Sequence, residues 1–303
     1  MSKVKRGATW AEAFARLDAD GIVAVVGDKG KSIGHIHDMD IRTALLDGAD
    51  LSDEITVRAK RTSRAATPSA ALPIAVIMAG GRGERLRPLT DKVPKPLLKV
   101  GTTSIVERIM SAIALAGIKK VYLSVNYKAK VFEQRLGDGS KQGVELSYLK
   151  EVQKLDTAGA LSLLPGRPKV PILVTNADIL TRLNFARLIE FHRHHGKAMT
   201  VAGTYHSTTI PYGVISNKGA RLVALQEKPE LKVLCNAGIY VLEPEVLQLI
   251  RKDESVDMPS LIERVRSGAG GVNVFPIIEK WFDIGSYEDF QRVLMEFATY
   301  EEE

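Results

Sequence analysis

The 303-residue chain contains a single cysteine, Cys235. One cysteine excludes an internal disulfide framework, and such a chain is typical of a reducing compartment. The sequence also lacks any run near the roughly 20 consecutive apolar residues of a membrane-spanning helix. Its basic start is not followed by the apolar core of a signal peptide. We therefore expect a cytoplasmic protein without a membrane segment.

Clustered positive charge is missing as well. The net charge is +6 at pH 7, but the 42 Lys and Arg are scattered among 36 Asp and Glu, with the densest basic run at 58–64. Nucleic-acid binding usually needs a basic stripe or a recognisable module, so we expect no nucleic-acid partner. A binder driven by net charge is the alternative, and phosphorylated small substrates explain the surplus equally well.

A polar, aperiodic stretch divides the chain. Residues 57–72 are rich in small residues and predict a linker between a small domain at 1–56 and a large domain at 73–303. The large part is long enough to bury a core without disulfides. The small part is not, so we expect it to pack on the large domain or on a partner chain.

The large domain alternates strand and helix patterns, which predicts an α/β fold with a mixed, mainly parallel, Rossmann-like sheet. The continuous apolar run at 74–79 is typical of a strand buried on both faces. Further strands are expected at 121–125, 146–149 and 172–175, with helices at 104–116, 128–136, 185–194 and 287–300. After residue 199 we expect shorter strands and turns, which form the acceptor-binding part.

A glycine-rich turn follows the first strand of the large domain. Residues 78–90 read MAGGRGERLRPLT, and glycines without side chains let backbone N–H groups approach phosphate oxygens. Two other nucleotide motifs are excluded, because Leu86 stands where a Rossmann fingerprint needs glycine, and Val25 stands where a P-loop before Gly30 needs one. The candidate nucleotide-binding residues of this turn are Ala79, Gly80, Gly81 and Gly83.

Residues 78–97 resemble the motif of sugar-1-phosphate nucleotidyltransferases, (L/M)-A-G-G-x-G-x-R-L-x-P-L-T…P-K-P, with Glu84 where Thr is usual. The resemblance covers essentially the whole large domain. It implies the nucleotide-diphospho-sugar transferase type of fold. It also implies that the loop holds a nucleoside triphosphate, whose phosphates are gripped by Arg85 and Lys95.

Other segments match this family in the expected order. The segment Thr157-Ala158-Gly159 resembles the family's T-A-G motif near the base and ribose. The resemblance further implies that Asp178, at the end of a buried strand, and Asp283, in a W-x-D-I-G motif, bind Mg²⁺. Two carboxylates suit Mg²⁺, which completes its shell with phosphate oxygens and water.

Between the two aspartates lie segments that resemble the sugar-binding motifs Y-G-V, E-K-P and N-A-G. The resemblance implies that Glu227 accepts hydrogen bonds from sugar hydroxyls and that Lys228 joins Arg85 and Lys95 as a catalytic cation. The implied reaction is in-line attack of the sugar phosphate on the nucleotide α-phosphorus, which needs no general base. The candidate sugar-binding residues are Asn176, Tyr212, Gly213, Glu227 and Asn236.

The identity of the nucleotide rests on Glu151. A carboxylate suits the paired N–H donors of guanine, which favours GTP, and the sequence resembles mannose-1-phosphate guanylyltransferases in general. Uridylyl transfer and a merely solvent-exposed Glu151 are the alternatives. A non-catalytic sugar-nucleotide sensor is the rival from another class, although the presence of both Asp178 and Asp283 argues against it. We therefore expect an enzyme making a nucleotide sugar for surface glycans.

The N-terminal segment 32–46 resembles the core of a CBS domain, as found in front of glucosamine-1-phosphate guanylyltransferases of legionaminic acid biosynthesis. The resemblance implies a small α+β domain in which Asp40 can bind ribose. His37 and Met39 depart from the usual Thr and Gly, and only one repeat is present. Nucleotide sensing, dimerisation and a structural role remain open, and we expect a homo-oligomer.

Overall fold

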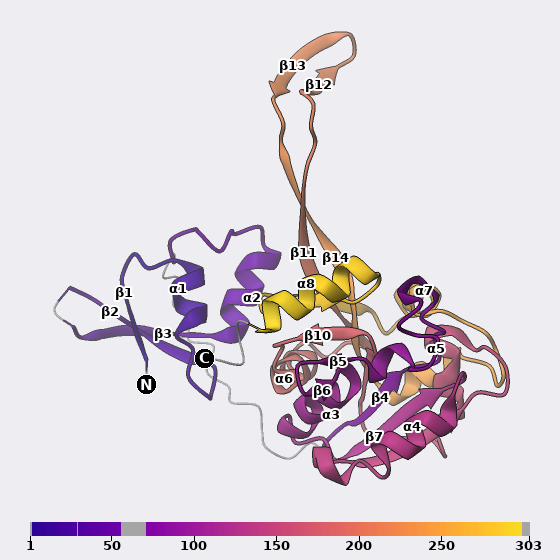
Figure 1. The fold of residues 1–303 in the computed structure, drawn as a ribbon. Coiled ribbons are helices and arrows are strands. Elements are labelled where there is room, and N and C mark those ends of the chain that lie inside the picture. The colour runs from indigo at the N-terminus through magenta and orange to yellow at the C-terminus, as the bar shows by residue number, and fades with distance from the viewer. Residues whose placement is uncertain (1, 29, 56–70, 299–303) are drawn as a thin grey trace. The chain divides into compact units, whose positions relative to one another are not determined.

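The computed structural model describes residues 2–28, 30–55 and 71–298 and divides into two compact units, Met1–Ala70 and Ala71–Glu303 (Figure 1). Most of the predicted linker lies outside the described residues. Among the helices that are described, none is long and apolar enough to cross a membrane.

The N-terminal unit is a small α+β structure. Its sheet has the order β1 (Lys3–Lys5), β2 (Ile22–Val26), β3 (Ser32–His37), with β1 and β2 parallel and β2 and β3 antiparallel. Two helices accompany it, α1 (Trp10–Ala15) and α2 (Asp38–Leu46).

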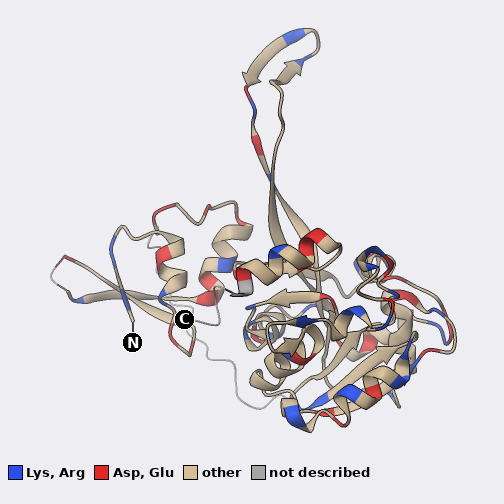
Figure 2. Cartoon of the chain, viewed as in Figure 1, with Lys and Arg blue, Asp and Glu red and all other residues tan. Residues whose placement is uncertain are grey.

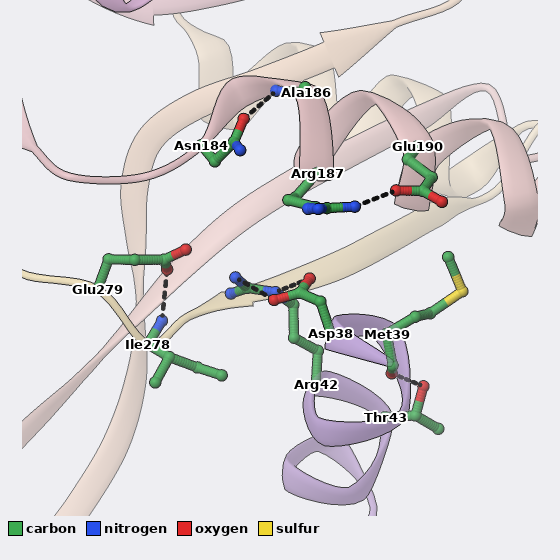
Figure 3. Close-up of polar contacts among 10 residues, drawn as sticks. All are labelled: Asp38, Met39, Arg42, Thr43, Asn184, Ala186, Arg187, Glu190, Ile278 and Glu279. Atoms are coloured by element: carbon green, nitrogen blue, oxygen red, sulfur yellow. Dashed lines mark hydrogen bonds and ion pairs between the residues drawn. The ribbon is translucent and has the colours of Figure 1, made fainter. Parts of the chain in front are cut away.

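Helix α2 carries a buried ion pair. Arg42 donates from Nε and Nη2 to the two carboxylate oxygens of Asp38, at 2.8 and 3.0 Å (Figure 3). Such bidentate geometry offsets the cost of burying both charges. Asp40 accepts the backbone N–H of His37 at 2.9 Å and so caps the helix. The predicted CBS character of the unit stays a prediction.

The C-terminal unit is built on a seven-stranded sheet. Four neighbouring strands are parallel, and β14 runs antiparallel to both β9 and β11, while β11 and β15 are parallel. The predicted mixed, mainly parallel sheet is confirmed. The order is β15 (Val272–Ile277), β11 (Met199–Thr209), β14 (Glu230–Leu242), β9 (Ile172–Asn176), β4 (Ile74–Met78), β7 (Lys120–Val125) and β8 (Glu145–Lys150).

Helices bury the apolar faces of this sheet. Side chains of α5, α7 and two 3₁₀ helices pack on one face in a single cluster with Val76, Val174 and Leu242, while α6 packs against β11, β14 and β15. Within α6, Arg187 pairs with Glu190 (Figure 3). The helices are α3 (Ile105–Leu115), α4 (Ala129–Leu136), α5 (Asp156–Gly159), α6 (Phe185–His195), α7 (Met258–Ser267) and α8 (Tyr287–Ala298), and the 3₁₀ helices are η1 (Glu84–Leu86), η2 (Lys95–Leu97), η3 (Ser140–Gln142), η4 (Ala160–Leu163) and η5 (Pro244–Leu249).

Three small two-stranded sheets complete the unit. They pair β5 (Lys99–Val100) with β6 (Thr103–Ser104), β10 (Ile179–Thr181) with β16 (Trp281–Asp283), and β12 (Val214–Lys218) with β13 (Arg221–Gln226). Basic and acidic residues are interleaved along the elements of both units (Figure 2).

A long β-ribbon projects from the sheet. Strands β11 and β14 continue beyond it as a two-stranded antiparallel ribbon that ends in the β12–β13 hairpin (Figure 1). We name residues 204–236 the arm. The expectation of shorter strands after residue 199 is wrong, because β11 and β14 have 11 and 13 residues. Their outer halves are exposed, so no alternation of buried and polar residues marks them in the sequence.

Candidate functional site

Two aspartates are brought together by a short strand pair. Asp178 lies in the turn between β9 and β10, and Asp283 ends β16. The antiparallel pairing of β10 with β16 sets Asp283 opposite Ile179, and the backbone N–H of Ile284 donates to the carbonyl of Asp178 at 3.1 Å. Residues more than 100 positions apart in the sequence therefore form one acidic pair.

Two cations from the loop after β4 complete this cluster. Lys95 is 9% exposed, and its Nζ lies 2.6 Å from Oδ2 of Asp178. Arg85, on η1, lies on the Asp283 side of the cluster. Its Nη1 and Oδ2 of Asp283 are 3.6 and 3.7 Å from one shared point, the position that a Cβ on Gly285 would occupy. We name Arg85, Lys95, Asp178 and Asp283 the aspartate cluster.

The electrostatics of the cluster centre on Asp283. Crowding by protein atoms raises the pKa of its carboxyl, and the neighbouring charge of Asp178 raises it further. Lys95 and Arg85 act in the opposite direction and lower this pKa. Two carboxylates that repel each other at a site holding cationic side chains suit a ligand that combines a divalent cation with phosphate groups.

The donor set fits Mg²⁺. Both aspartates supply hard carboxylate oxygens, and Oδ1 of Asp178 is the oxygen that Lys95 does not engage. No cluster of three or more His, Cys, Asp or Glu able to hold a metal occurs among the described residues. Mg²⁺ in proteins is usually held by one or two carboxylates, while phosphate oxygens and water fill its other positions.

Gly80, the first glycine of the predicted phosphate loop, leaves room for the carboxylate of Glu151. A Cβ at Gly80 would lie 2.6 Å from Oε1 of Glu151. That carboxylate accepts the hydroxyl of buried Ser124 at 2.7 Å and the backbone N–H of Leu155 at 3.1 Å. The alternative of a merely solvent-exposed Glu151 is wrong, because the side chain is half-buried and anchored. Recognition of guanine by Glu151 stays a prediction.

The other residues of the loop are fixed by similar contacts. The backbone N–H of Ala79 donates to the carbonyl of Ser124. Gly83 has a φ of 65°, and a Cβ there would lie 3.1 Å from Cβ of Lys95. The missing side chain at Gly83 thus lets Lys95 approach the loop closely, while Gly81 has nothing within 4 Å of its Cβ position.

The predicted T-A-G motif contacts a neighbouring segment of the chain. The backbone N–H groups of Ala158 and Gly159 both donate to the carbonyl of Val256, at 3.0 and 2.9 Å. Thr157 accepts the N–H of Met258 at 2.9 Å. A Cβ at Gly159 would lie 2.2 Å from the carbonyl oxygen of Glu254. These groups hold residues 254–258 in place, a role that the motif alone did not reveal.

Two predicted sugar-binding residues lie at the base of the arm. Asn236 accepts the N–H of Gly238 at 3.0 Å. Gly238 has a φ of 70°, and a Cβ there would lie 2.6 Å from Nδ2 of Asn176. The indole N–H of Trp281 donates to the carbonyl of Ala237 at 3.0 Å. The base of the arm therefore adjoins the strand that carries Asp283.

The remaining predicted residues lie together near the end of the arm. The backbone N–H of Lys228 donates to the carbonyl of Tyr212 at 3.3 Å, and a Cβ at Gly213 would lie 3.0 Å from Oε2 of Glu227. Because β14 rises about 3.3 Å per residue, Glu230 is roughly 20 Å from Asn236, and Lys228 lies further out. The structure does not bring these residues to the aspartate cluster of their own chain.

Comparison with known proteins identifies relatives of the C-terminal unit. Residues 74–299 match the nucleotidyl transferase family. The chain is 36% identical over 228 residues to the mannose-1-phosphate guanylyltransferase catalytic subunit beta of Drosophila pseudoobscura pseudoobscura, covering 71% of this chain and 60% of the relative. It is 33% identical over 224 residues to the mannose-1-phosphate guanylyltransferase of Mycobacterium tuberculosis, covering 72% of this chain and 62% of the relative.

The chain thus spans about 60% of the length of the curated relatives it matches. Among solved structures, HddC from Yersinia pseudotuberculosis, in a complex with GMP-PN, superposes with a TM-score of 0.58. That comparison has 20% sequence identity and covers 75% of this chain and 100% of the other, so it shows a common fold.

Proposed function

The chain belongs to the nucleotidyl transferase family, and we propose that it transfers a guanylyl group from GTP to a sugar-1-phosphate, giving a nucleotide sugar and pyrophosphate. The aspartate cluster carries this proposal, because it sets two cations and two carboxylates together, with Lys95 packed against Gly83 of the glycine loop. The guanylyltransferase names of relatives at 33–36% identity support the choice of base.

The reaction forms one bond and breaks one. An oxygen of the sugar phosphate bonds to the α-phosphorus of GTP, and the bond from that phosphorus to the bridging oxygen of the β-phosphate breaks. The attacking phosphate is already ionised, so no side chain has to remove a proton. Mg²⁺ held by Asp178 and Asp283 would neutralise charge on the reacting phosphates.

The cations of the chain have separate tasks in this scheme. Lys95 is buried and held by its ion pair with Asp178, so its ammonium group is positioned before substrate binds. Arg85 is more exposed and lies at the Asp283 side, where it can follow the departing pyrophosphate. Preorganised charge of this kind stabilises a transition state without reorganisation.

The test is pyrophosphate release, measured with each of four nucleoside triphosphates and a panel of sugar-1-phosphates that includes mannose and glucosamine forms. We expect turnover with GTP, and Asp178→Asn should lower kcat at least about 100-fold, as expected for losing a preorganised charge. Asp253→Asn is the matched control, because Asp253 is exposed with a φ of 59°, which Asn tolerates. Unchanged turnover in Asp178→Asn, or no turnover of any pair by the unaltered protein, would refute the proposal.

A further inference from the structure

Lys128 adopts a backbone conformation that is unusual for a lysine. It lies in the turn between β7 and α4, with φ and ψ of 57° and 34°, in the left-handed region. Residues other than glycine, asparagine and aspartate are rare in this region. Such strain persists where the surrounding structure holds the residue, and strained residues gather at functional sites. A lysine at this position indicates that its side chain does something that a glycine could not.

The ammonium group of Lys128 binds a second loop. Its Nζ donates to the carbonyl of Asp91 at 2.5 Å and to the carbonyl of Thr90 at 3.3 Å. It also lies 4.9 Å from the centre of the Tyr127 ring. Both carbonyls belong to the turn at 87–94, which joins η1 to η2. Because a charged donor makes stronger hydrogen bonds than a neutral one, this single side chain fixes the main chain of the turn at two successive residues.

Thr90 connects this turn to the glycine loop. Thr90 is 3% exposed, and its hydroxyl donates to the carbonyl of Gly83 at 2.7 Å. A Cβ at Gly83 would lie 3.1 Å from Cγ2 of Thr90 and also 3.1 Å from Cβ of Lys95. Gly83 is therefore enclosed between Thr90 and Lys95, so a shift of Thr90 displaces the residue against which Lys95 packs.

Lys95 ends this series of contacts at the aspartate cluster. It is 9% exposed, and its Nζ lies 2.6 Å from Oδ2 of Asp178. The contacts run without a gap from Lys128 through Thr90 and Gly83 to this ammonium group. Close-packed protein interiors transmit strain, and a misplacement of about 1 Å caused by a mutation far from the reacting atoms can lower a rate about 100-fold.

We propose that Lys128 is a positioning residue, which holds the ammonium group of Lys95 against Asp178 by fixing the turn at 87–94. Lys128 does not touch the substrate in this scheme, because its own ammonium group is engaged by two main-chain carbonyls. The left-handed turn directs the side chain toward those carbonyls, which accounts for a strained lysine where glycine would be relaxed. The positioning stands on these contacts alone, whereas its effect on turnover rests on the proposed function.

The positioning is tested by the reactivity of Lys95 toward an amine reagent, which does not depend on turnover. Reductive methylation with formaldehyde is followed by mass spectrometry, and the rate at Lys95 is divided by the rate at exposed Lys141. Glycine adopts a positive φ freely, so Lys128→Gly keeps the turn and removes only the side chain. We expect this variant to raise the relative rate several-fold. Lys128→Arg retains a cation with several donors and should keep the labelling slow.

Lys130→Gln is the matched control, because Lys130 is exposed two residues further along the chain and its loss changes the net charge equally. Its relative rate should equal that of the unaltered protein. Urea unfolding, followed by circular dichroism, separates a local release of Lys95 from a general loss of stability. The same relative rate at Lys95 in Lys128→Gly and in Lys130→Gln would overturn the proposal.

The catalytic consequence is tested by kcat with GTP and the sugar-1-phosphate that is turned over. We expect Lys128→Gly to lower kcat about tenfold, and Thr90→Val, which removes the hydroxyl bound to Gly83, to lower it by a similar factor. The two factors should not multiply in the double variant, because both changes break one series of contacts. Multiplying factors, or an unchanged kcat in Lys128→Gly, would overturn the effect on catalysis. Absence of turnover in the unaltered protein would reject the proposed function, while the labelling rates would still decide the positioning.

Discussion

Replacing Gly80 by alanine should destabilise the C-terminal unit through a side chain 71 positions away in the sequence. The new Cβ would lie 2.6 Å from Oε1 of Glu151, so the carboxylate must move. Movement breaks its hydrogen bonds to Ser124 and to the backbone of Leu155. A hydrogen bond to a charged group contributes about 1.5–3 kcal/mol, and a buried hydroxyl left without a partner costs about 1–3 kcal/mol.

The expected loss is smaller than the sum of these terms. Glu151 is only half-buried, so the displaced carboxylate regains water, and alanine restricts the unfolded chain by about 0.4–1 kcal/mol in favour of folding. We expect Gly80→Ala to lower the free energy of unfolding by about 2–3 kcal/mol. Gly81→Ala, on the same loop with nothing within 4 Å of its Cβ, should change it by less than about 1 kcal/mol.

A double-mutant cycle under urea, followed by circular dichroism, separates this mechanism from general strain in the loop. Glu151→Ala removes the same two hydrogen bonds, so Gly80→Ala should cost little in that background. The coupling energy between the two changes should therefore be about 2–3 kcal/mol, as seen for residues in contact. Additive effects, or an equal loss in Gly81→Ala, would show that Gly80 does not act through Glu151.

Two further predictions concern single side chains. If Glu151 also recognises the base, Glu151→Gln should lower the ratio of kcat/KM for GTP to kcat/KM for UTP by about tenfold, because one hydrogen bond to a charged acceptor is lost. An unchanged ratio would show that Glu151 takes no part in base recognition. Burial lowers the pKa of His192, although Glu243, 3.1 Å from its Nε2, raises it. Because the unfolded chain then binds the proton more tightly, the free energy of unfolding should fall as the pH drops below about 6.5. Urea unfolding at pH 7.5 and at pH 5.5 measures this fall, which should be smaller in His192→Gln than in the unaltered protein. An equal fall in that variant would assign the pH dependence to other groups.

The sequence predicted best the elements that the core encloses. The strands at 74–79 and 172–175 were placed within one residue, because a strand buried on both faces reads as an uninterrupted apolar run. The outer halves of β11 and β14 escaped prediction, because residues such as Thr208 and Lys232 are exposed and carry no periodic signal. An exposed strand has no buried face, so hydrophobic periodicity does not reveal it.

The candidate site was predictable in composition but not in geometry. Family resemblance named Asp178 and Asp283, but only the pairing of β10 with β16 shows that they adjoin. The glycines illustrate a different limit. A glycine-rich loop suggests close approach of phosphate, yet Gly80 is required by Glu151, and Gly159 by the carbonyl of Glu254. Sequence cannot tell whether the missing side chain makes room for a ligand or for the protein itself.

The base of the arm is joined to the strand that carries Asp283. Trp281 hydrogen-bonds to Ala237 at the base of the arm and precedes Asp283 by two residues on a three-residue strand. The base of the arm therefore restrains the strand that positions the carboxylate of Asp283.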